Sequence, residues 1–283
     1  MTNSRGTRFS TKHVNLTIND YAFWDFSFHE IGLYDLRASL KYIYRKSNQR
    51  KIIVIGHSMG STESLIYASM FPEEAKKLSH VFILMGPTSS LKYIKGRIFA
   101  QLIPFLQEYA EKERLGVAFW KSSTMADIVH NMCPHIPDFC ITVFNFVGAG
   151  WAEEEENPPA AALILTQHPR AMSYKSIFHY GQFVSSGKFQ MFDYGQKNIE
   201  TYGKLEPPEY PIEQIKAPIF LVYSPSDNFA PEKDIDNLYQ RLPGISKIYG
   251  KLRIEKMNHI DIIMGKHRKE KIYYKIEDLL NKL

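Results

Sequence analysis

Residues 51–60 read Lys-Ile-Ile-Val-Ile-Gly-His-Ser-Met-Gly, and this stretch decides the fold. The β-branched run at 52–55 predicts a buried strand, and a helical pattern follows it as far as Met70. Between them, Gly56 to Gly60 has the Gly-x-Ser-x-Gly spacing of a strand-to-helix turn that exposes a serine hydroxyl above an α/β sheet. Glycines suit such a turn because the serine backbone is strained and neighbouring elements pack closely. We therefore predict an α/β fold with Ser58 as a nucleophile, the alternative being an ordinary turn.

Composition narrows the class of protein. The chain has 283 residues, 44% of them hydrophobic, enough for one large core or for one core with a substantial insertion. The net charge of +5 is spread without a basic stripe, so nucleic acid is not an expected partner. No apolar run reaches the length of a transmembrane helix, and no signal peptide is visible in this chain. Composition does not indicate the oligomeric state.

Two cysteines, Cys133 and Cys140, lie seven positions apart. The sequence around them does not decide between a small disulfide loop and two buried thiols, which are equally plausible. The spacing lacks the paired ligands of a zinc site. We expect neither a metal nor an organic cofactor.

The order of predicted elements divides the chain. Ser27 and Glu30 have the spacing of a capping box, which opens a helix ending near 45–47. Further strands are predicted at 80–85, 218–223 and, more weakly, 248–257, with helices at 232–242 and 269–280. The segment 89–216 does not continue this alternation of strands and helices. We therefore assign 1–88 and 217–283 to the core domain and 89–216 to a largely helical cap or lid insertion. Within the cap, five apolar residues recur at helical spacing and are predicted to be core: Ile98, Leu102, Phe105, Leu106 and Tyr109.

A serine nucleophile needs an imidazole to take its proton and a carboxylate to orient that imidazole. In α/β-hydrolases these partners follow in the order serine, acid, histidine, each after a later strand. Asp227 directly follows the strand at 218–223, and His259 follows the last strand. The predicted catalytic residues are Ser58, Asp227 and His259, with the backbone N–H of Met59 as an oxyanion donor.

Other acidic residues fit this role less well. Asp234 and Asp236 fall within the helix after Asp227, where we expect both to face solvent. Asp261 is two residues from His259 and is expected to cap the final helix instead.

Other histidines are weaker candidates for the base. His57 lies within the turn, where its ring is expected to pack or hydrogen-bond. His168 and His179 belong to the inserted segment.

Several segments together resemble the acid lipase family, which includes gastric and lysosomal acid lipases. They are Asn3-Ser-Arg-Gly6, Phe23-Trp-Asp-Phe-Ser27 with Tyr34-Asp-Leu36, Gly56-His-Ser-Met-Gly60, Phe178-His179, Ser186-Gly-Lys-Phe-Gln190 with Asp193-Tyr-Gly195, and Asn258-His259. The resemblance implies an α/β-hydrolase fold and a lipase that hydrolyses triacylglycerols or sterol esters at a lipid–water interface, with Ser58, Asp227 and His259 as its triad. It also implies a secreted or lysosomal location, and a lid at about 121–148 in which Cys133 and Cys140 can pair.

The position of Ser58 departs from that pattern. Only 57 residues precede it, whereas the early strands of such a fold need on the order of 100 residues. We therefore expect a hydrolase fold that lacks its first strands, lacks one oxyanion donor and leaves 52–55 as an aggregation-prone edge. The alternative function is an inactive, incomplete hydrolase-fold protein that binds lipid or a protein partner. A third is hydrolysis of a small ester, thioester or amide, which the large aromatic cap disfavours.

Overall fold

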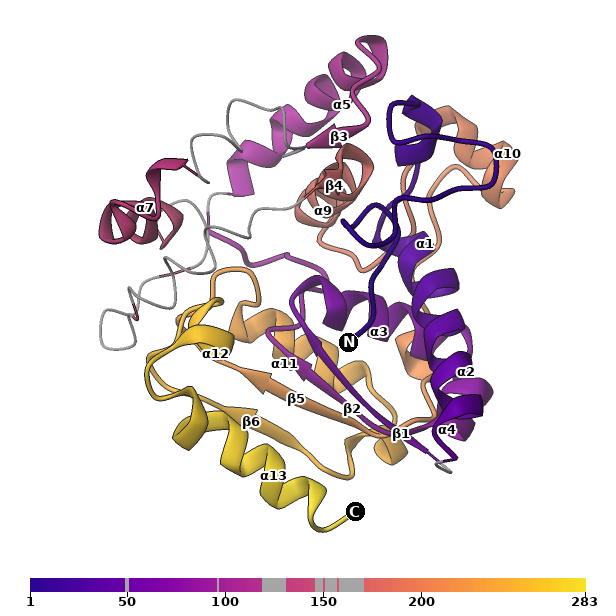
Figure 1. Ribbon diagram of the computed structural model, residues 1–283. Coiled ribbons are helices and arrows are strands. Elements are labelled where there is room, and N and C mark those ends of the chain that lie inside the picture. The colour runs from indigo at the N-terminus through magenta and orange to yellow at the C-terminus, as the bar shows by residue number, and fades with distance from the viewer. Residues whose placement is uncertain (49–50, 96, 119–130, 146–149, 151–156, 158–170) are drawn as a thin grey trace.

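The computed structural model describes residues 1–48, 51–95, 97–118, 131–145, 150, 157 and 171–283. At its centre lies a four-stranded parallel sheet (Figure 1). The strands are β1 (Ile52–His57), β2 (Ser79–Met85), β5 (Ile219–Tyr223) and β6 (Lys251–Arg253), in the order β1-β2-β5-β6. A parallel sheet whose strands are separated by helices confirms the predicted α/β fold.

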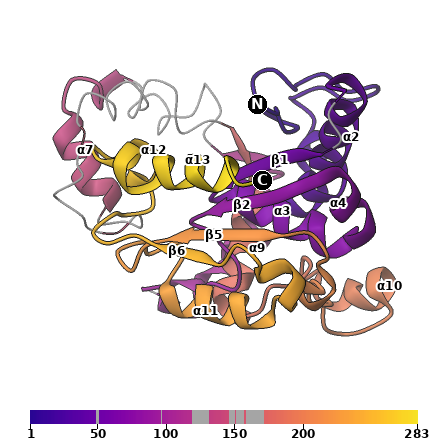
Figure 2. The ribbon, with the colours of Figure 1, turned by 90° about the horizontal axis from the view of Figure 1, so that it is seen from below.

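Both faces of the sheet are buried at β2 and β5, whose successive side chains point in opposite directions. Phe82 and Leu84 of β2 join a core with helices α3 (Met59–Met70), α4 (Pro72–Leu78) and α11 (Glu232–Arg241). The alternating residues Val81 and Ile83 pack on the other face. There they meet α12 (Asp261–Met264), the π-helical turn Lys269–Tyr273 and α13 (Tyr274–Leu280). Figure 2 shows α11 and α13 on opposite sides of the sheet.

The helix at the N-terminal side forms as its sequence predicts. It begins at α1 (Phe28–Glu30), passes through a π-helical segment (Ile31–Leu36) and continues as α2 (Arg37–Lys46). The Ser27 N–H donates to Glu30 Oε2 at 2.7 Å, and the His29 N–H donates to Ser27 Oγ at 3.1 Å. The predicted capping box is therefore confirmed.

The last strand is shorter than predicted. Only Lys251–Arg253 pair with β5, in register with Leu221, Val222 and Tyr223. A 3-10 turn at Gly244–Lys247 occupies the preceding residues, and Gly250 has φ +74°, which ends extended backbone on that side. Strand propensity over 248–257 is thus overridden by a turn.

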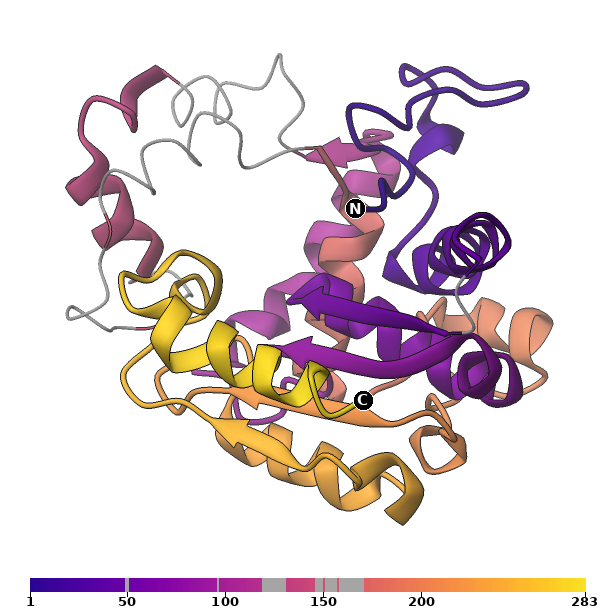
Figure 3. The ribbon, with the colours of Figure 1, turned by 60° about the horizontal axis from the view of Figure 1, so that its bottom comes forward.

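Over its described residues, the inserted segment is largely helical. Its elements are η3 (Arg97–Leu102), α5 (Ile103–Lys112), β3 (Val117–Ala118), α7 (Pro137–Phe144), β4 (Met172–Ser173), α9 (Tyr174–Ser186), η6 (Gly195–Lys197), α10 (Asn198–Tyr202) and η7 (Ile212–Gln214). Cys133 and Cys140 form a disulfide just before and within α7. The later part of this segment is not packed separately, because Phe183, Tyr210 and Ile212 belong to the same core as the sheet. Figure 3 shows α5 and α9 rising from the sheet and α7 lying farther to one side.

The prediction that the apolar stripe of η3 and α5 is core is wrong. Its five residues are exposed: Ile98, Leu102, Phe105, Leu106 and Tyr109. The helix instead turns Ile103 and Ala110 inward, where Ile103 lies against the backbone of Gly181 in α9. Helical periodicity located the helix but not the face that packs.

The strand β1 forms one edge of the sheet. Among the described residues, no strand pairs with its outer side, and Ile53 and Ile55 are 40% and 53% exposed. Aggregation at this edge stays a prediction. Within the same described ranges, no helix combines the length and the apolar character needed to cross a bilayer.

Candidate active site

The turn after β1 holds Ser58 in a strained conformation. Ser58 has φ 55° and ψ −119°, outside the regions that residues with a side chain usually adopt. Two hydrogen bonds fix it: the Ser58 N–H donates to the Met85 carbonyl at 3.0 Å, and Ser61 Oγ donates to the Gly56 carbonyl at 2.8 Å. The strand-to-helix elbow predicted from the sequence is therefore present.

The two glycines of the motif are not equivalent. A Cβ on Gly56 would lie 2.6 Å from the Gly60 carbonyl oxygen, so this position requires glycine. A Cβ on Gly60 would meet nothing within 4 Å among the described residues. The expectation that both glycines relieve crowding holds here only for Gly56.

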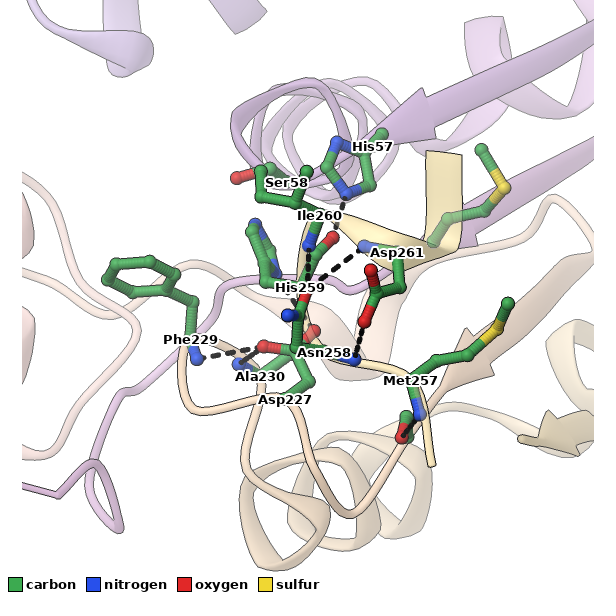
Figure 4. Close-up of polar contacts among 12 residues, drawn as sticks. His57, Ser58, Asp227, Phe229, Ala230, Met257, Asn258, His259, Ile260 and Asp261 are labelled. Atoms are coloured by element: carbon green, nitrogen blue, oxygen red, sulfur yellow. Dashed lines mark hydrogen bonds and ion pairs between the residues drawn. The ribbon is translucent and has the colours of Figure 1, made fainter. Parts of the chain in front are cut away.

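The structure brings Asp227 and His259 together at the carboxyl end of the sheet. Asp227 follows β5, His259 follows β6, and His259 Nδ1 lies 2.8 Å from Asp227 Oδ2 (Figure 4). Both side chains are buried. The other carboxylate oxygen of Asp227 accepts the N–H groups of Phe229 at 2.8 Å and Ala230 at 2.9 Å. Such a carboxylate fixes the imidazole with its second nitrogen directed away from the acid.

That second nitrogen, His259 Nε2, is buried and has no hydrogen-bond partner among the described residues. Ser58, half-buried on the neighbouring elbow, therefore does not hydrogen-bond to it in this conformation. Bonds of this kind are often long in the absence of substrate. An unpartnered buried nitrogen is available to accept a proton.

The Met59 N–H lies at the start of α3, where a helix has no acceptor of its own for the first amide groups. The positive end of the helix dipole lies at the same place. These properties suit a donor to an oxyanion formed beside Ser58.

His57, the last residue of β1, contacts the loop that carries His259. Its Nε2 lies 2.9 Å from the His259 carbonyl oxygen, and the two imidazole rings lie 4.8 Å apart, tilted by 37°. Burial, reinforced by the neighbouring His259, lowers the pKa of His57 to about 4. The expectation that His57 hydrogen-bonds, and does not replace His259 as partner of the acid, matches this geometry.

Asp261 is engaged by hydrogen bonds at the start of α12, and the expectation that it caps the final helix is wrong. Its Oδ2 accepts the Asn258 N–H at 2.9 Å, while Asn258 Oδ1 accepts the N–H groups of Ile260 at 2.9 Å and Asp261 at 3.0 Å. Asp261 is the first residue of α12, directly after His259, and does not belong to the final helix. These bonds fix the backbone on both sides of the histidine.

The expectation for Asp234 is wrong. Its carboxylate is 1% exposed and accepts Ser90 Oγ at 2.5 Å and the N–H of Tyr93 at 3.0 Å. It anchors the loop after β2 onto α11. Asp236 does face outward, where it pairs with Lys251.

Of the two histidines in the inserted segment, His168 lies outside the described residues. His179 is fully buried, with its Nε2 2.9 Å from the Gln190 carbonyl and its Nδ1 3.1 Å from Ser27 Oγ. Burial lowers its pKa to about 3. It is a structural residue that joins α9 to the N-terminal helix.

Gly86 is a site residue that sequence reasoning missed. It follows β2 with φ +54°, and a Cβ there would lie 3.0 Å from Asp227 Oδ2 and 3.1 Å from His259 Nδ1. The available signal was a glycine directly after a buried strand, which is also the signal of an ordinary turn.

Two residues of the inserted segment contact the loops that carry Asp227 and His259. Asn258 Nδ2 donates to Asn145 Oδ1 at 3.0 Å, and Gly150 packs so tightly on the Ser226 carbonyl that a Cβ would overlap it. Asn145 is buried, and its own Nδ2 has no partner among the described residues. The loops of Asp227 and His259 are thus each covered by one of these residues.

Comparison with known proteins extends this description. Residues 1–265 match the family described as alpha/beta hydrolase fold. The chain is 31% identical to the lysosomal acid lipase/cholesteryl ester hydrolase of Rattus norvegicus, over all of this chain and 71% of that protein. It is 29% identical to the gastric triacylglycerol lipase of the same species, over 96% of this chain and 68% of that one.

A solved structure shows the same fold. The Mycobacterium tuberculosis protein BpoC, described as a non-heme bromoperoxidase, superposes with a TM-score of 0.50 at 12% identity, covering 91% of this chain and 75% of its own. Identity this low supports a common fold and nothing about activity.

Proposed function

The chain belongs to the acid lipase family of α/β hydrolases, and on that premise we propose that it is a serine-dependent carboxylic ester hydrolase acting on neutral lipid esters. The observation that carries the proposal is the strained Ser58 elbow beside the buried Asp227–His259 pair. The proposed substrates are triacylglycerols or sterol esters. Relatives named for both substrate classes, and the aromatic-rich cap, support that choice.

The proposed reaction uses two transfers at one serine. His259 Nε2 takes the Ser58 hydroxyl proton as Oγ attacks the ester carbonyl carbon, and the Met59 N–H donates to the oxyanion. The tetrahedral intermediate collapses, the C–O bond to the alcohol breaks, and His259 returns its proton to that alcohol. His259 then takes a proton from water as its oxygen attacks the acyl carbon; the C–O bond to Ser58 Oγ breaks and His259 returns the proton to Oγ, which releases the fatty acid and free Ser58. Asp227 orients the imidazole and stabilises its charged form throughout.

The Cys133–Cys140 disulfide supports a location outside the cytosol, because disulfides persist in oxidising compartments. We therefore propose that the protein is secreted or lysosomal. Its partners would be lipid esters at a lipid–water interface.

A fluorophosphonate probe tests the nucleophile directly. We expect the purified chain to be labelled at Ser58, the Ser58→Ala variant to be unlabelled, and the exposed-serine control Ser186→Ala to be labelled as the parent chain is. Asp227→Asn should reduce the labelling rate by about 10³–10⁴-fold. A folded chain that binds lipid vesicles without labelling would instead identify an inactive lipid-binding protein.

Ester chain length tests the substrate. Hydrolysis of long-chain p-nitrophenyl esters or triacylglycerol emulsions should exceed that of acetyl esters, since the proposed substrate is a lipid. A preference for acetyl esters would contradict the lipid assignment while leaving the serine mechanism intact.

A further inference from the structure

His57 links the nucleophile elbow to the loop that carries His259. It directly precedes Ser58, and its ring is bonded to the backbone of His259, 202 positions along the chain. Ser58 itself makes no hydrogen bond to His259 Nε2 in the described structure. The polar contact that joins the elbow to the base is therefore made by His57.

The hydrogen bond to a carbonyl oxygen fixes the tautomer of the His57 ring. A carbonyl oxygen can only accept, so His57 Nε2 must carry the proton and donate it across the 2.9 Å separation. With a pKa lowered to about 4 by burial and by the neighbouring His259, the ring is uncharged near neutral pH, and Nδ1 then carries a lone pair.

Other contacts also hold His259, since the bonds of Asn258 and Asp261 fix the backbone on both sides of it. Asp227 holds Nδ1, and Phe229 packs edge-on against the ring at 5.2 Å. The carbonyl bond from His57 sets how far the His259 backbone lies from the elbow. Its uncharged ring also lies beside the place where the imidazolium forms, and a second cation there would oppose that charge.

We propose that His57 is a positioning residue for His259, holding the backbone of the base against the nucleophile elbow and presenting an uncharged ring to its imidazole. The inference rests on the proposed function, since positioning matters only if Ser58 and His259 react. His57 itself does not touch the substrate or transfer a proton.

Three variants distinguish the effect of the His57 hydrogen-bond donor from that of its ring and from that of an unrelated histidine substitution. His57→Gln keeps an N–H donor without the ring, His57→Phe keeps a ring without the donor, and His267→Phe replaces an exposed histidine as the control. In His57→Phe we expect kcat for a long-chain ester to fall by about 10–100-fold with KM nearly unchanged, because misplaced catalytic groups slow chemistry more than binding. His57→Gln should recover much of that loss, and His267→Phe should match the parent chain.

A second measurement does not depend on turnover. The proton between His259 Nδ1 and Asp227 should give a downfield ¹H NMR resonance, assigned by its absence in Asp227→Asn. We expect that resonance to be retained in His57→Gln and broadened or shifted in His57→Phe, each variant first shown to unfold cooperatively.

The outcomes are distinct. An unchanged resonance and an unchanged kcat in folded His57→Phe would overturn the positioning role. Equal damage in His57→Gln and His57→Phe would also overturn it, since the retained donor would then have no effect. If the resonance depends on His57 but Ser58 of the parent chain never reacts with a fluorophosphonate, the proposed function fails and the positioning contact stands.

Discussion

At the scale of single residues, the site depends on backbone positions that lack a side chain. Gly56 allows the elbow to close on the Gly60 carbonyl, and Gly86 allows Asp227 and His259 to approach the end of β2. Ser58 adopts a strained backbone because its neighbours fix it by hydrogen bonds. The placement of the nucleophile, acid and base therefore depends partly on the missing side chains of these two glycines.

Gly86→Ala tests this at the acid–base pair. We expect fluorophosphonate labelling of Ser58 to slow by at least about tenfold, because the new Cβ would press on Asp227 Oδ2 and His259 Nδ1. The positive φ adds a stability loss of about 1 kcal/mol. Gly203→Ala is the matched control, with φ +69° and, among the described residues beyond its chain neighbours, no atom within 4 Å of its Cβ. Equal effects of the two changes on labelling would show that crowding at the pair is unimportant.

At the scale of an element, α3 is unusual because nearly all of it is buried. Residues 61–69 are all buried, and among them is Glu63, a carboxyl group within the core. Burial, with a smaller contribution from Asp35, raises the pKa of Glu63 to about 8. The nucleophile helix thus carries an acid that stays protonated near neutral pH.

Linkage gives the direction of the pH effect. The pKa of Glu63 is about 8 in the folded chain against 4.5 for the free group, so the folded state holds one more proton between these values. Stability from this group is fully present below pH 4.5 and is lost as the pH rises through 8.

Glu63→Gln should remove that dependence. At one pKa unit per about 1.4 kcal/mol, we expect the variant to exceed the parent in free energy of unfolding by about 3 kcal/mol at pH 7, and to match it near pH 4.5. Denaturant unfolding at the two pH values measures the difference. The exposed control Glu108→Gln should differ from the parent by the same free energy of unfolding at both pH values. The same result for Glu63→Gln would contradict the prediction.

At the scale of the whole molecule, segments far apart in sequence meet at the carboxyl end of the sheet. Asn145 from the cap bonds Asn258, Gly150 packs on Ser226, and His179 of α9 bonds Ser27. The loops carrying Asp227 and His259 are consequently fixed by the inserted segment as well as by the strands below them.

Asn145→Ala tests this connection. Removing the acceptor leaves Asn258 Nδ2 without its partner, a buried loss of about 1–3 kcal/mol. We expect hydrogen exchange of the amides of residues 258–261 to accelerate by roughly 5–100-fold. The control Thr142→Ala, on the exposed side of α7, should leave these amides unchanged. Equal exchange rates in all three proteins would mean that the cap does not hold the His259 loop.

Local sequence patterns were enough to locate most of the elements and the candidate site. Short-range patterns carried this information: β-branched runs for β1, β2 and β5, the capping box at Ser27, and the order serine, acid, histidine after successive strands. The 248–257 strand was overestimated because a local turn outweighed its β propensity.

Which surfaces meet depends on the folded chain, because the partners come from distant segments. Sequence could not show that Asp234 is buried, because a helical carboxylate becomes internal only when a loop such as 90–93 supplies its donors. It could not show that the stripe from Ile98 to Tyr109 faces outward, because periodicity gives a face but not the partner of that face. The contacts of Gly86 and His57 with His259 join segments more than 170 positions apart, and no local pattern encodes that proximity.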